Sequence, residues 1–308
     1  MFEALTPLIE TAPLSPGARV ALVAPASAVP AQRLQPAVDF VRALGLEPVV
    51  YPSCYFENRH GYLAAEDARR AGDLQEAFAD GTVDGVWCIR GGYGAHRLLP
   101  LLDLDAVRTH PKRFLGYSDV TALHTAFNQA CGFVTYHTVM PSTETDADEF
   151  TLARLKRALF GSLAGPLESP RPMAALVPGK ASGALCGGNL SLLAASLGTP
   201  WELDTRGKLL FLEDIGEKTY RVDAMLTQLR NAGKFHDCAG VILGAWTDCP
   251  PEDPENTLGL PEIFAELIAP AGKPAVMGLA CGHTLPTLSL PLGALAELDA
   301  DALTLTVL

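Results

Sequence analysis

Short apolar runs alternate with stretches of helical periodicity through the first half of the chain. The apolar runs predict buried strands at 19–27, where the strand continues into a loop of small residues, and at 47–51, 85–89 and 113–115. Helical spacing of apolar residues predicts helices at 31–44, 66–79, 96–102 and 120–130. Strands that alternate with helices form βαβ units, so we expect an N-terminal α/β domain with a mainly parallel sheet flanked by helices.

The pattern changes at residues 163–183, which are rich in Pro, Gly and Ser and show no sustained period. We therefore predict a linker there, between an N-terminal domain, 1–162, and a C-terminal domain, 184–308. In the C-terminal domain, apolar runs predict strands at 208–212, 240–244 and 275–278, and helical spacing predicts helices at 190–197, 220–232 and 261–268. Residues 294–308 are typical of an antiparallel ribbon, so we expect a mixed or barrel-like sheet.

Composition narrows the class of protein. Of the 308 residues, 48% are hydrophobic and 19% are charged, which suits a folded chain with a sizeable core. The net charge of -12, with no cluster of Lys and Arg, makes nucleic acid an unfavourable partner. No apolar run approaches the roughly 20 residues of a membrane helix. The first 18 residues contain no Lys or Arg and are interrupted by acids, which is unlike a secretory signal, so we predict a cytoplasmic protein.

The cysteines exclude two kinds of stabilising framework. Seven cysteines are scattered along the chain without a Cys-x-x-Cys pair. This pattern is typical of reduced thiols and indicates neither a disulfide framework nor a structural zinc site. We therefore expect no metal site.

A serine follows the fourth predicted strand, in the segment Gly116-Tyr-Ser118-Asp-Val120. A serine on a sharp turn between a strand and a helix is the setting of a nucleophile elbow, in which the hydroxyl is exposed and backbone N–H groups face a developing oxyanion. The match to Gly-x-Ser-x-Gly is partial, because Val120 occupies the fifth position. A serine that caps the helix without catalytic role explains the same residues, so both interpretations stay open.

Adjacent glycines follow the third predicted strand, in Arg90-Gly91-Gly92-Tyr-Gly94. Glycines of this kind let the backbone approach a ligand closely and turn N–H groups toward it. The loop therefore suits half of an oxyanion hole or a phosphate cradle, although a tight turn without function is equally consistent. It matches neither the dinucleotide-binding fingerprint nor the P-loop.

An acidic group and a histidine complete the residue types that acyl transfer needs. Glu213, Asp214 and Glu217 follow an apolar strand, and His283 follows a glycine after another. A solvated acidic loop and a structural histidine are the simpler explanations for each taken alone. In combination with the serine, however, a histidine can take the hydroxyl proton, and a carboxylate can orient the imidazole and stabilise its charged form.

Five ordered motifs resemble those of the LD-carboxypeptidase family: RGGYGAHRLLPLLD, FLGYSDVTALH, GGNLSLLAASLGTPW, LFLEDIGEKTYRVDAMLTQLRNAG and GHTLPTLSLPLGA. The resemblance extends from about Gly17 to about Ala296. The family comprises serine peptidases, which include murein tetrapeptide carboxypeptidases and microcin C self-immunity proteins. It implies an N-terminal α/β domain that carries the serine and a C-terminal domain that carries the acid and the histidine. We therefore expect the active site at the interface of the two domains.

The resemblance also implies a Ser–Glu–His triad. Ser118 matches the family nucleophile, Glu213 the triad carboxylate, and His283 the general base. Asp214 and Glu217 are then supporting residues.

The oxyanion donors that the resemblance implies are the N–H groups of Asp119 and Gly92, with Gly91 as the alternative to Gly92. A carboxypeptidase must also hold a free carboxylate, for which an arginine fork is well suited. Arg90 and Arg221 lie within the motifs and are candidates for substrate binding, although a structural ion pair is the simpler role for each.

The implied reaction is hydrolysis of the amide before the terminal D-Ala of a murein tetrapeptide, as in peptidoglycan recycling. It needs a small peptide substrate and no cofactor, and the resemblance also suggests a homodimer. The first alternative is a microcin-C-type self-immunity hydrolase of acyl-aspartyl amides or acyl-sulfamoyl nucleotides. The second is a non-catalytic protein that binds a small molecule on its glycine loop. One departure bears on substrate preference: His137-Thr138-Val139-Met140 stands where many relatives have His-Gly-Pro-Met.

Overall fold

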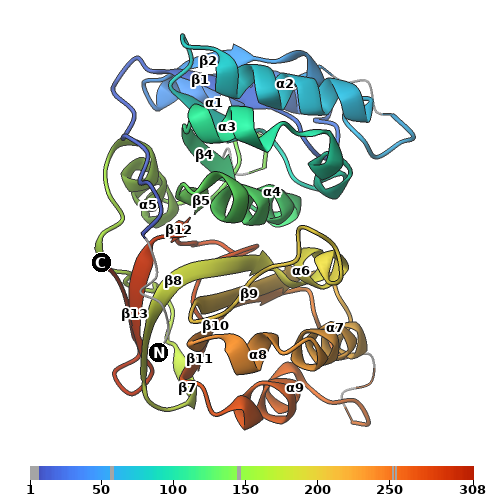
Figure 1. Cartoon of the computed structure of the whole chain (residues 1–308), viewed down its shortest axis with the longest axis vertical. Coiled ribbons are helices and arrows are strands. Elements are labelled where there is room, and N and C mark those ends of the chain that lie inside the picture. The colour runs from blue at the N-terminus through green and yellow to red at the C-terminus, as the bar shows by residue number, and fades with distance from the viewer. Residues whose placement is uncertain (1–6, 56–58, 144–146, 252, 254) are drawn as a thin grey trace. The chain divides into compact units, whose positions relative to one another are not determined.

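Parallel strands joined by crossover helices confirm the mainly parallel sheet predicted for the first half of the chain (Figure 1). In the computed structural model, which describes residues 7–55, 59–143, 147–251, 253 and 255–308, this sheet has the order β12-β5-β4-β3-β1-β2. The pairs formed among β1 to β5 are parallel. The strands are β1 Arg19–Val23, β2 Glu47–Val50, β3 Gly85–Cys88, β4 Arg113–Gly116, β5 Thr135–His137 and β12 Leu290–Leu292.

This sheet belongs to one of two units, which we call the N-terminal unit, Leu8–Ser162 with Ser289–Pro291. Its helices are α1 Ala31–Ala43, α2 Asp67–Ala79, α3 Leu104–Thr109, α4 Thr121–Ala126, which continues as a π-helical turn, and α5 Glu149–Phe160. The helix predicted at 96–102 is wrong, because two short 3-10 turns, Ala95–Arg97 and Leu99–Leu101, occupy that segment. Pro100 has no N–H to donate to an α-helical bond. Apolar periodicity did not reveal α3 and α5.

The strand order brings three loops to one edge of this sheet. β1 and β3 are neighbours, but the chain continues from β1 to β2 on one side and from β3 to β4 on the other. Open α/β sheets bind ligands at such a switch point, beyond the carboxyl ends of the strands. The segments that follow β1, β3 and β4 include residues 24–30, 89–94 and 116–118, which contain the glycine loop and Ser118.

The C-terminal unit, Leu163–Leu288 with Leu292–Leu308, contains a mixed sheet rather than a closed barrel in its described residues. The strand order is β6-β14-β13-β8-β9-β10-β11-β7, with parallel pairing from β8 to β11 and antiparallel neighbours outside them. The ribbon predicted at 294–308 is confirmed as β13 and β14. The strands are β6 Gly165–Pro166, β7 Ala174–Val177, β8 Lys180–Asn189, β9 Leu209–Ile215, β10 Gly240–Thr247, β11 Ala275–Met277, β13 Leu295–Asp299 and β14 Thr304–Val307. Residues 163–183, where we expected a linker, therefore contain the short strands β6 and β7 and the first residues of β8.

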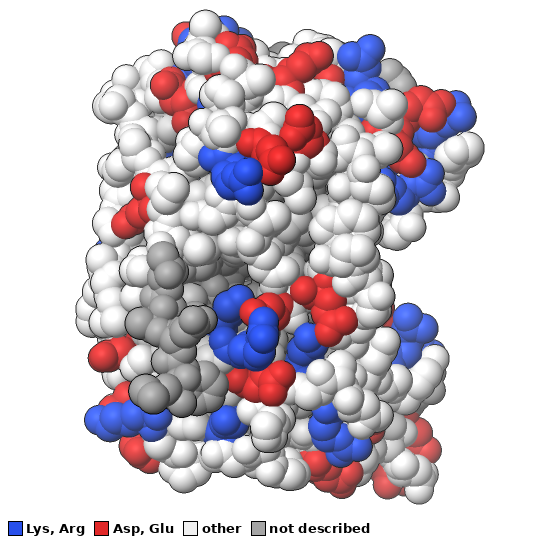
Figure 2. Space-filling view, in the orientation of Figure 1, with Lys and Arg blue, Asp and Glu red and all other residues white. Residues whose placement is uncertain are grey.

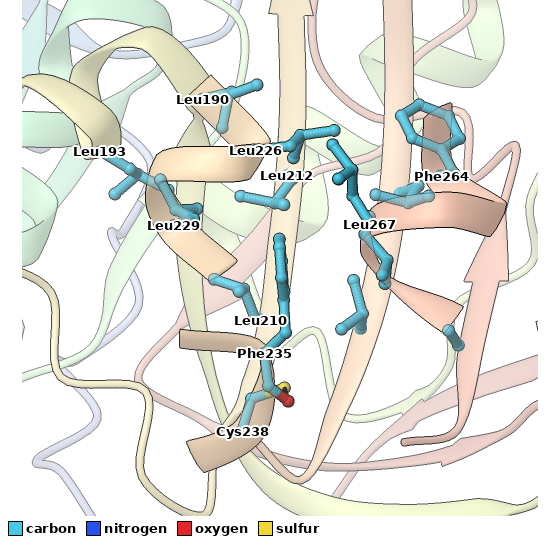
Figure 3. Close-up of a cluster of buried hydrophobic side chains, with 14 of the residues drawn as sticks. Leu190, Leu193, Leu210, Leu212, Leu226, Leu229, Phe235, Cys238, Phe264 and Leu267 are labelled. Atoms are coloured by element: carbon cyan, nitrogen blue, oxygen red, sulfur yellow. Dashed lines mark hydrogen bonds between the residues drawn. The ribbon is translucent and has the colours of Figure 1, made fainter. Parts of the chain in front are cut away.

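The core of this unit explains how β9 positions its last residues. Leu210 and Leu212 pack against helix residues that include Leu226 and Phe264 (Figure 3). Since alternate residues of a strand point to opposite faces, Glu213 faces away from this cluster. The helices of the unit are α6 Leu190–Ser196, α7 Thr219–Asn231, α8 Lys234–Asp237 and α9 Leu260–Leu267.

The surface charges and the helix lengths bear on which partners the protein can have. On the face drawn in Figure 2, acidic and basic side chains are interspersed, without an extended patch of Lys and Arg. Among the residues that the structure describes, no helix is both long and apolar enough to span a bilayer. Residues 1–6, which begin the stretch examined for a secretory signal, lie outside the described residues.

A buried histidine in the N-terminal unit gives the first prediction. His124 on α4 is fully buried, and its Nε2 lies 2.9 Å from the carbonyl oxygen of Gly116. Burial lowers the pKa of His124 to about 4. The unfolded chain therefore takes up this proton between pH 6.5 and 4, so the contribution of His124 to the free energy of unfolding decreases as pH falls through that window.

We expect NMR to find His124 neutral, with its proton on Nε2, from pH 8 down to about 4. A histidine in a short unstructured peptide, with a pKa of about 6.5, is the control for a solvated imidazole. A His124 resonance that titrates near pH 6.5, as that of the peptide does, would contradict the assignment.

Candidate active site

Ser118 occupies a strained turn between β4 and α4. Its φ angle of 63° lies in the left-handed region, which is unusual for a residue other than glycine and is typical of functional turns. Gly116 nearby is closely packed, because a Cβ there would lie 3.0 Å from a methyl carbon of Val120 and 3.1 Å from Cβ of Cys88 and would press on both side chains. At the fifth position of the Gly-x-Ser-x-Gly motif, where a glycine is usual, Val120 instead packs its methyl groups against Gly116. The hydroxyl of Ser118 caps no helix in the described structure, so the geometry favours the nucleophile elbow over a simple cap.

The strand end before this turn is fixed by two donors. The carbonyl oxygen of Gly116 accepts a hydrogen bond from the backbone N–H of Thr138 at 3.0 Å and from Nε2 of His124. These bonds fix the end of β4, two residues before Ser118.

The glycine loop lies directly against Ser118. A Cβ at Gly91 would be 3.0 Å from Cβ and 3.1 Å from Oγ of Ser118, so any larger residue would press on the serine side chain. Gly92 has a φ of +111°, and a Cβ there would overlap the side chain of Ser27. Close packing, of Gly91 against Ser118 and of Gly92 against Ser27, therefore accounts for both glycines as well as the turn does.

Some backbone N–H groups of the glycine loop and of the serine turn are already bonded, and others are available to a ligand. Tyr93 donates its N–H to Oγ of Ser27 at 3.1 Å, and Ala95 donates to the Asp119 carboxylate at 2.7 Å. For the N–H groups of Gly91, Gly92 and Asp119, no acceptor is found within the described ranges. These are the three groups predicted as oxyanion donors, and they flank the serine.

Glu213 and His283 form a buried pair in the C-terminal unit. Glu213 ends the apolar part of β9 and has no exposed surface. Its Oε2 lies 2.7 Å from Nδ1 of His283 and also accepts the backbone N–H of His283 at 3.3 Å. A carboxylate at Nδ1 holds the proton on that nitrogen, which leaves Nε2 as the basic nitrogen. The pair therefore has the geometry of a general base and its orienting acid.

Gly282 makes this pair possible. Its φ is +113°, and a Cβ there would lie 2.5 Å from Oε2 of Glu213 and 2.9 Å from Cβ and Cγ of the same side chain. The glycine before the histidine lets the backbone pack directly on the carboxylate.

Asp214 has a structural role on the opposite face of β9. Its carboxylate accepts Nδ2 of Asn189 at 2.8 Å and the backbone N–H of Ser191, in the first turn of α6, at 2.9 Å. Burial raises the pKa of Asp214 to about 6, and the negative charge of Glu213 adds to the increase. Asn189 was missed from the sequence, although it lies in the Gly-Gly-Asn motif and pairs in register with Glu213.

The two candidate arginines have partners in the structure. Arg90 donates Nη1 to the carbonyl oxygen of Ala28 at 2.8 Å. Arg221 on α7 is exposed and pairs with Glu217, with 2.6 Å between Nε and Oε2. These contacts are the structural roles considered above, and a role in substrate binding remains a prediction.

The departure at 137–140 lies close to the serine turn. Thr138 bonds Gly116 through its N–H and contacts Oγ of Ser289 through its hydroxyl at 2.6 Å. The carbonyl oxygen of Val139 accepts the indole N–H of Trp87 at 3.0 Å. Met140 packs beside Gly91, where a Cβ would be 3.2 Å from its terminal methyl. The substituted residues are therefore part of the support of the turn.

Metal-binding geometry is absent from the part of the chain that the structure describes. No group of three or more His, Cys, Asp and Glu side chains there could hold a metal ion.

Comparisons with known proteins place this geometry in a family. A model of the LD-carboxypeptidase N-terminal domain matches residues 20–138, and a model of the LD-carboxypeptidase C-terminal domain matches residues 182–298. The chain belongs to the LD-carboxypeptidase family. It is an α/β protein and a serine carboxypeptidase by this membership.

Three similar proteins illustrate the relationship. A probable murein peptide carboxypeptidase of Bacillus subtilis is 43% identical over 289 residues, which are 93% of this chain and 90% of the relative. The crystal structure of a muramoyltetrapeptide carboxypeptidase from Oxalobacter formigenes has a TM-score of 0.79 and 32% identity, covering 93% of this chain and 97% of that one. The structure of MccF in complex with glutamyl sulfamoyl guanosine has a TM-score of 0.86, covering 96% and 97%; at 23% identity it shows the fold alone.

The packing of Gly282 against Glu213 yields a prediction. We expect Gly282→Ala to displace the carboxylate and to remove the far-downfield imidazole proton resonance that a His283–Glu213 hydrogen bond gives in ¹H NMR, together with peptidase activity. Gly272→Ala is the matched control, because Gly272 also has a positive φ, +66°, but nothing lies within 4 Å of its added Cβ.

The control should lose about 1 kcal/mol of stability from backbone strain and keep the resonance. If Gly282→Ala retained both the resonance and the activity, the close packing would not be needed for the pair.

Proposed function

We propose that this protein hydrolyses the amide before the terminal D-Ala of murein tetrapeptides, as in peptidoglycan recycling. The observation that carries the proposal is the buried Glu213–His283 pair, because an imidazole oriented by a carboxylate at Nδ1 is the base that serine peptidases use. The strained turn of Ser118 against Gly91 supports the same chemistry. The murein peptides named for two relatives support the choice of substrate.

Each residue has a distinct role in the proposed reaction. Ser118 attacks the carbonyl carbon of the scissile amide while Nε2 of His283 takes the hydroxyl proton. Glu213 holds the imidazole in the required tautomer and stabilises the imidazolium. His283 then returns the proton to the departing amine of D-Ala, and water releases the acyl group from Ser118 by the reverse roles.

The oxyanion of the tetrahedral intermediate needs donors that are free before the reaction. The N–H groups of Gly92 and Asp119 fill this role in the proposal, with Gly91 as the alternative to Gly92. Donors fixed in advance stabilise the developing charge without reorganisation.

We also infer a cytoplasmic location and a homodimeric assembly. A muropeptide that is recycled is met in the cytoplasm, and two-fold dimers are the commonest soluble oligomers. The family resemblance supports both inferences.

The direct test is the release of D-Ala from a murein tetrapeptide by the purified protein. We expect Ser118→Ala to lose at least about 10³-fold in kcat/KM, because no other group supplies the nucleophile. Unchanged circular dichroism would exclude unfolding as the cause, and full activity of Ser118→Ala would refute the nucleophile assignment.

The same assay should include acyl-aspartyl amides and acyl-sulfamoyl nucleotides. Cleavage of these without D-Ala release would favour a self-immunity hydrolase. Binding of the tetrapeptide without turnover would favour a non-catalytic binding protein.

The two acids after β9 provide a matched pair of variants. Glu213→Gln removes the charge that stabilises the imidazolium, so we expect kcat to fall by about 10³- to 10⁴-fold. Glu217→Gln alters an ion pair with exposed Arg221 and should change kcat less than about threefold. Steady-state kinetics on both variants measure this, and the opposite order would mean that Glu217 is the acid.

A further inference from the structure

A fully buried arginine links the loops beside the serine. Arg70 on α2 has no exposed surface, and its guanidinium donates to the carbonyl oxygens of Gly94 at 3.0 Å, Ala65 at 3.1 Å, and Pro25. Its Nη2 also lies 2.5 Å from Oδ1 of Asp67. Gly94 follows β3 and Pro25 follows β1, so one side chain joins the two loops that meet at the switch point of the sheet.

The sequence of the loop is adapted to this side chain. Gly94 has a φ of +132°, and a Cβ there would lie 2.7 Å from Nη1 of Arg70 and 2.7 Å from Leu63. Burial lowers the pKa of Arg70, and Asp67 opposes the decrease. A buried guanidinium is destabilising unless its donors are bonded, and here each nitrogen has an acceptor.

A second anchor fixes the same loop from the side of the nucleophile. Asp119, which is 1% exposed and follows Ser118 in sequence, accepts the N–H of Ala95 at 2.7 Å. We call residues 90–95 the oxyanion loop. In this loop, Arg70 bonds the carbonyl oxygen of Gly94, and Asp119 bonds the N–H of Ala95. The N–H groups of Gly91 and Gly92 have no acceptor among the described residues.

We infer that Arg70 is a positioning residue for the reaction, which fixes the oxyanion loop so that the N–H groups of Gly91 and Gly92 stay at the distance from Ser118 that the transition state requires. The inference rests on the proposed serine chemistry. It concerns stabilisation of the tetrahedral intermediate and not the binding of the ground-state substrate, so Arg70 affects kcat more than KM.

The experiment compares Arg70→Lys with Arg113→Lys. Arg113 is the matched control, since it is also fully buried in the N-terminal unit and donates to three carbonyl oxygens, those of Thr11, Ala158 and Gly161. Those carbonyls lie outside the oxyanion loop. Lysine keeps the charge in both variants but cannot reach three carbonyls at once, so both should lose similar thermal stability.

Two readouts separate positioning from general destabilisation. In D-Ala release, we expect Arg70→Lys to lose about 10- to 100-fold in kcat with KM within threefold, less than deletion of an oxyanion donor. In modification by a fluorophosphonate probe, Ser118 displaces fluoride from phosphorus and the phosphoryl oxygen takes the oxyanion position. The modification rate should fall by a similar factor, and Arg113→Lys should stay within threefold of the wild type in both assays.

The outcomes decide the inference in each case. Equal losses in the two lysine variants, or an unchanged kcat in Arg70→Lys, would reduce Arg70 to a structural residue. If Arg70→Lys does not fold, Asp67→Asn replaces it, because this change weakens the hold on Arg70 without altering the buried side chain, and a several-fold loss in both assays is expected. If the wild type releases no D-Ala, the proposed substrate fails, and the fluorophosphonate rates alone still decide the role of Arg70.

Discussion

The carboxylate of Glu213 is removed from water, and most features of the C-terminal unit follow from this constraint. An ion without exposed surface is unstable in a protein unless hydrogen bonds replace its hydration. Here the imidazole and the backbone N–H of His283 both bond Oε2, which ties the loop after β11 to the end of β9, whereas Oε1 is buried without a partner among the described residues. Gly282 leaves room for the carboxylate because it has no side chain, and the buried apolar residues of β9 that precede Glu213 anchor the strand in the core.

In the N-terminal unit the corresponding constraint is space around a hydroxyl. Ser118 stands in a left-handed conformation, and three glycines near it are each explained by a specific neighbour rather than by flexibility. Gly116 makes room for Val120, Gly91 for Ser118 itself, and Gly94 for Arg70. The backbone around the unbonded N–H groups is therefore closely packed, which favours electrostatic preorganisation.

The sequence allowed some of this to be predicted, and the limits have physical causes. The parallel sheet followed from apolar runs of strand length. The residue types that acyl transfer needs indicated a serine, an acid and a histidine, and the resemblance to the LD-carboxypeptidase family selected Glu213 and His283. The helix predicted at 96–102 does not form, and Pro100, which lacks an N–H, is the residue in the sequence that indicates this. Arg70, Ser27 and Asn189 could not be found, because the contacts that give them a role, with Gly94, Tyr93 and Asp214, join residues 24 or more positions apart that only the fold brings together. Arg90 and Arg221 were chosen for their charge, whereas their contacts depend on the packing of neighbouring turns.

Two adjacent acids on β9 point to opposite faces of the sheet, so their contacts depend on the register of the strand. Glu213 faces the histidine, and Asp214 faces the start of α6. Because side chains alternate along a strand, an insertion or deletion of a single residue upstream would exchange the two carboxylates between the faces. A deletion would place Asp214 opposite the imidazole, an insertion would place Leu212 there, and in either case Glu213 would lie on the face of α6. Length variation among homologous chains should therefore concentrate in the loops around this strand and avoid the strand itself.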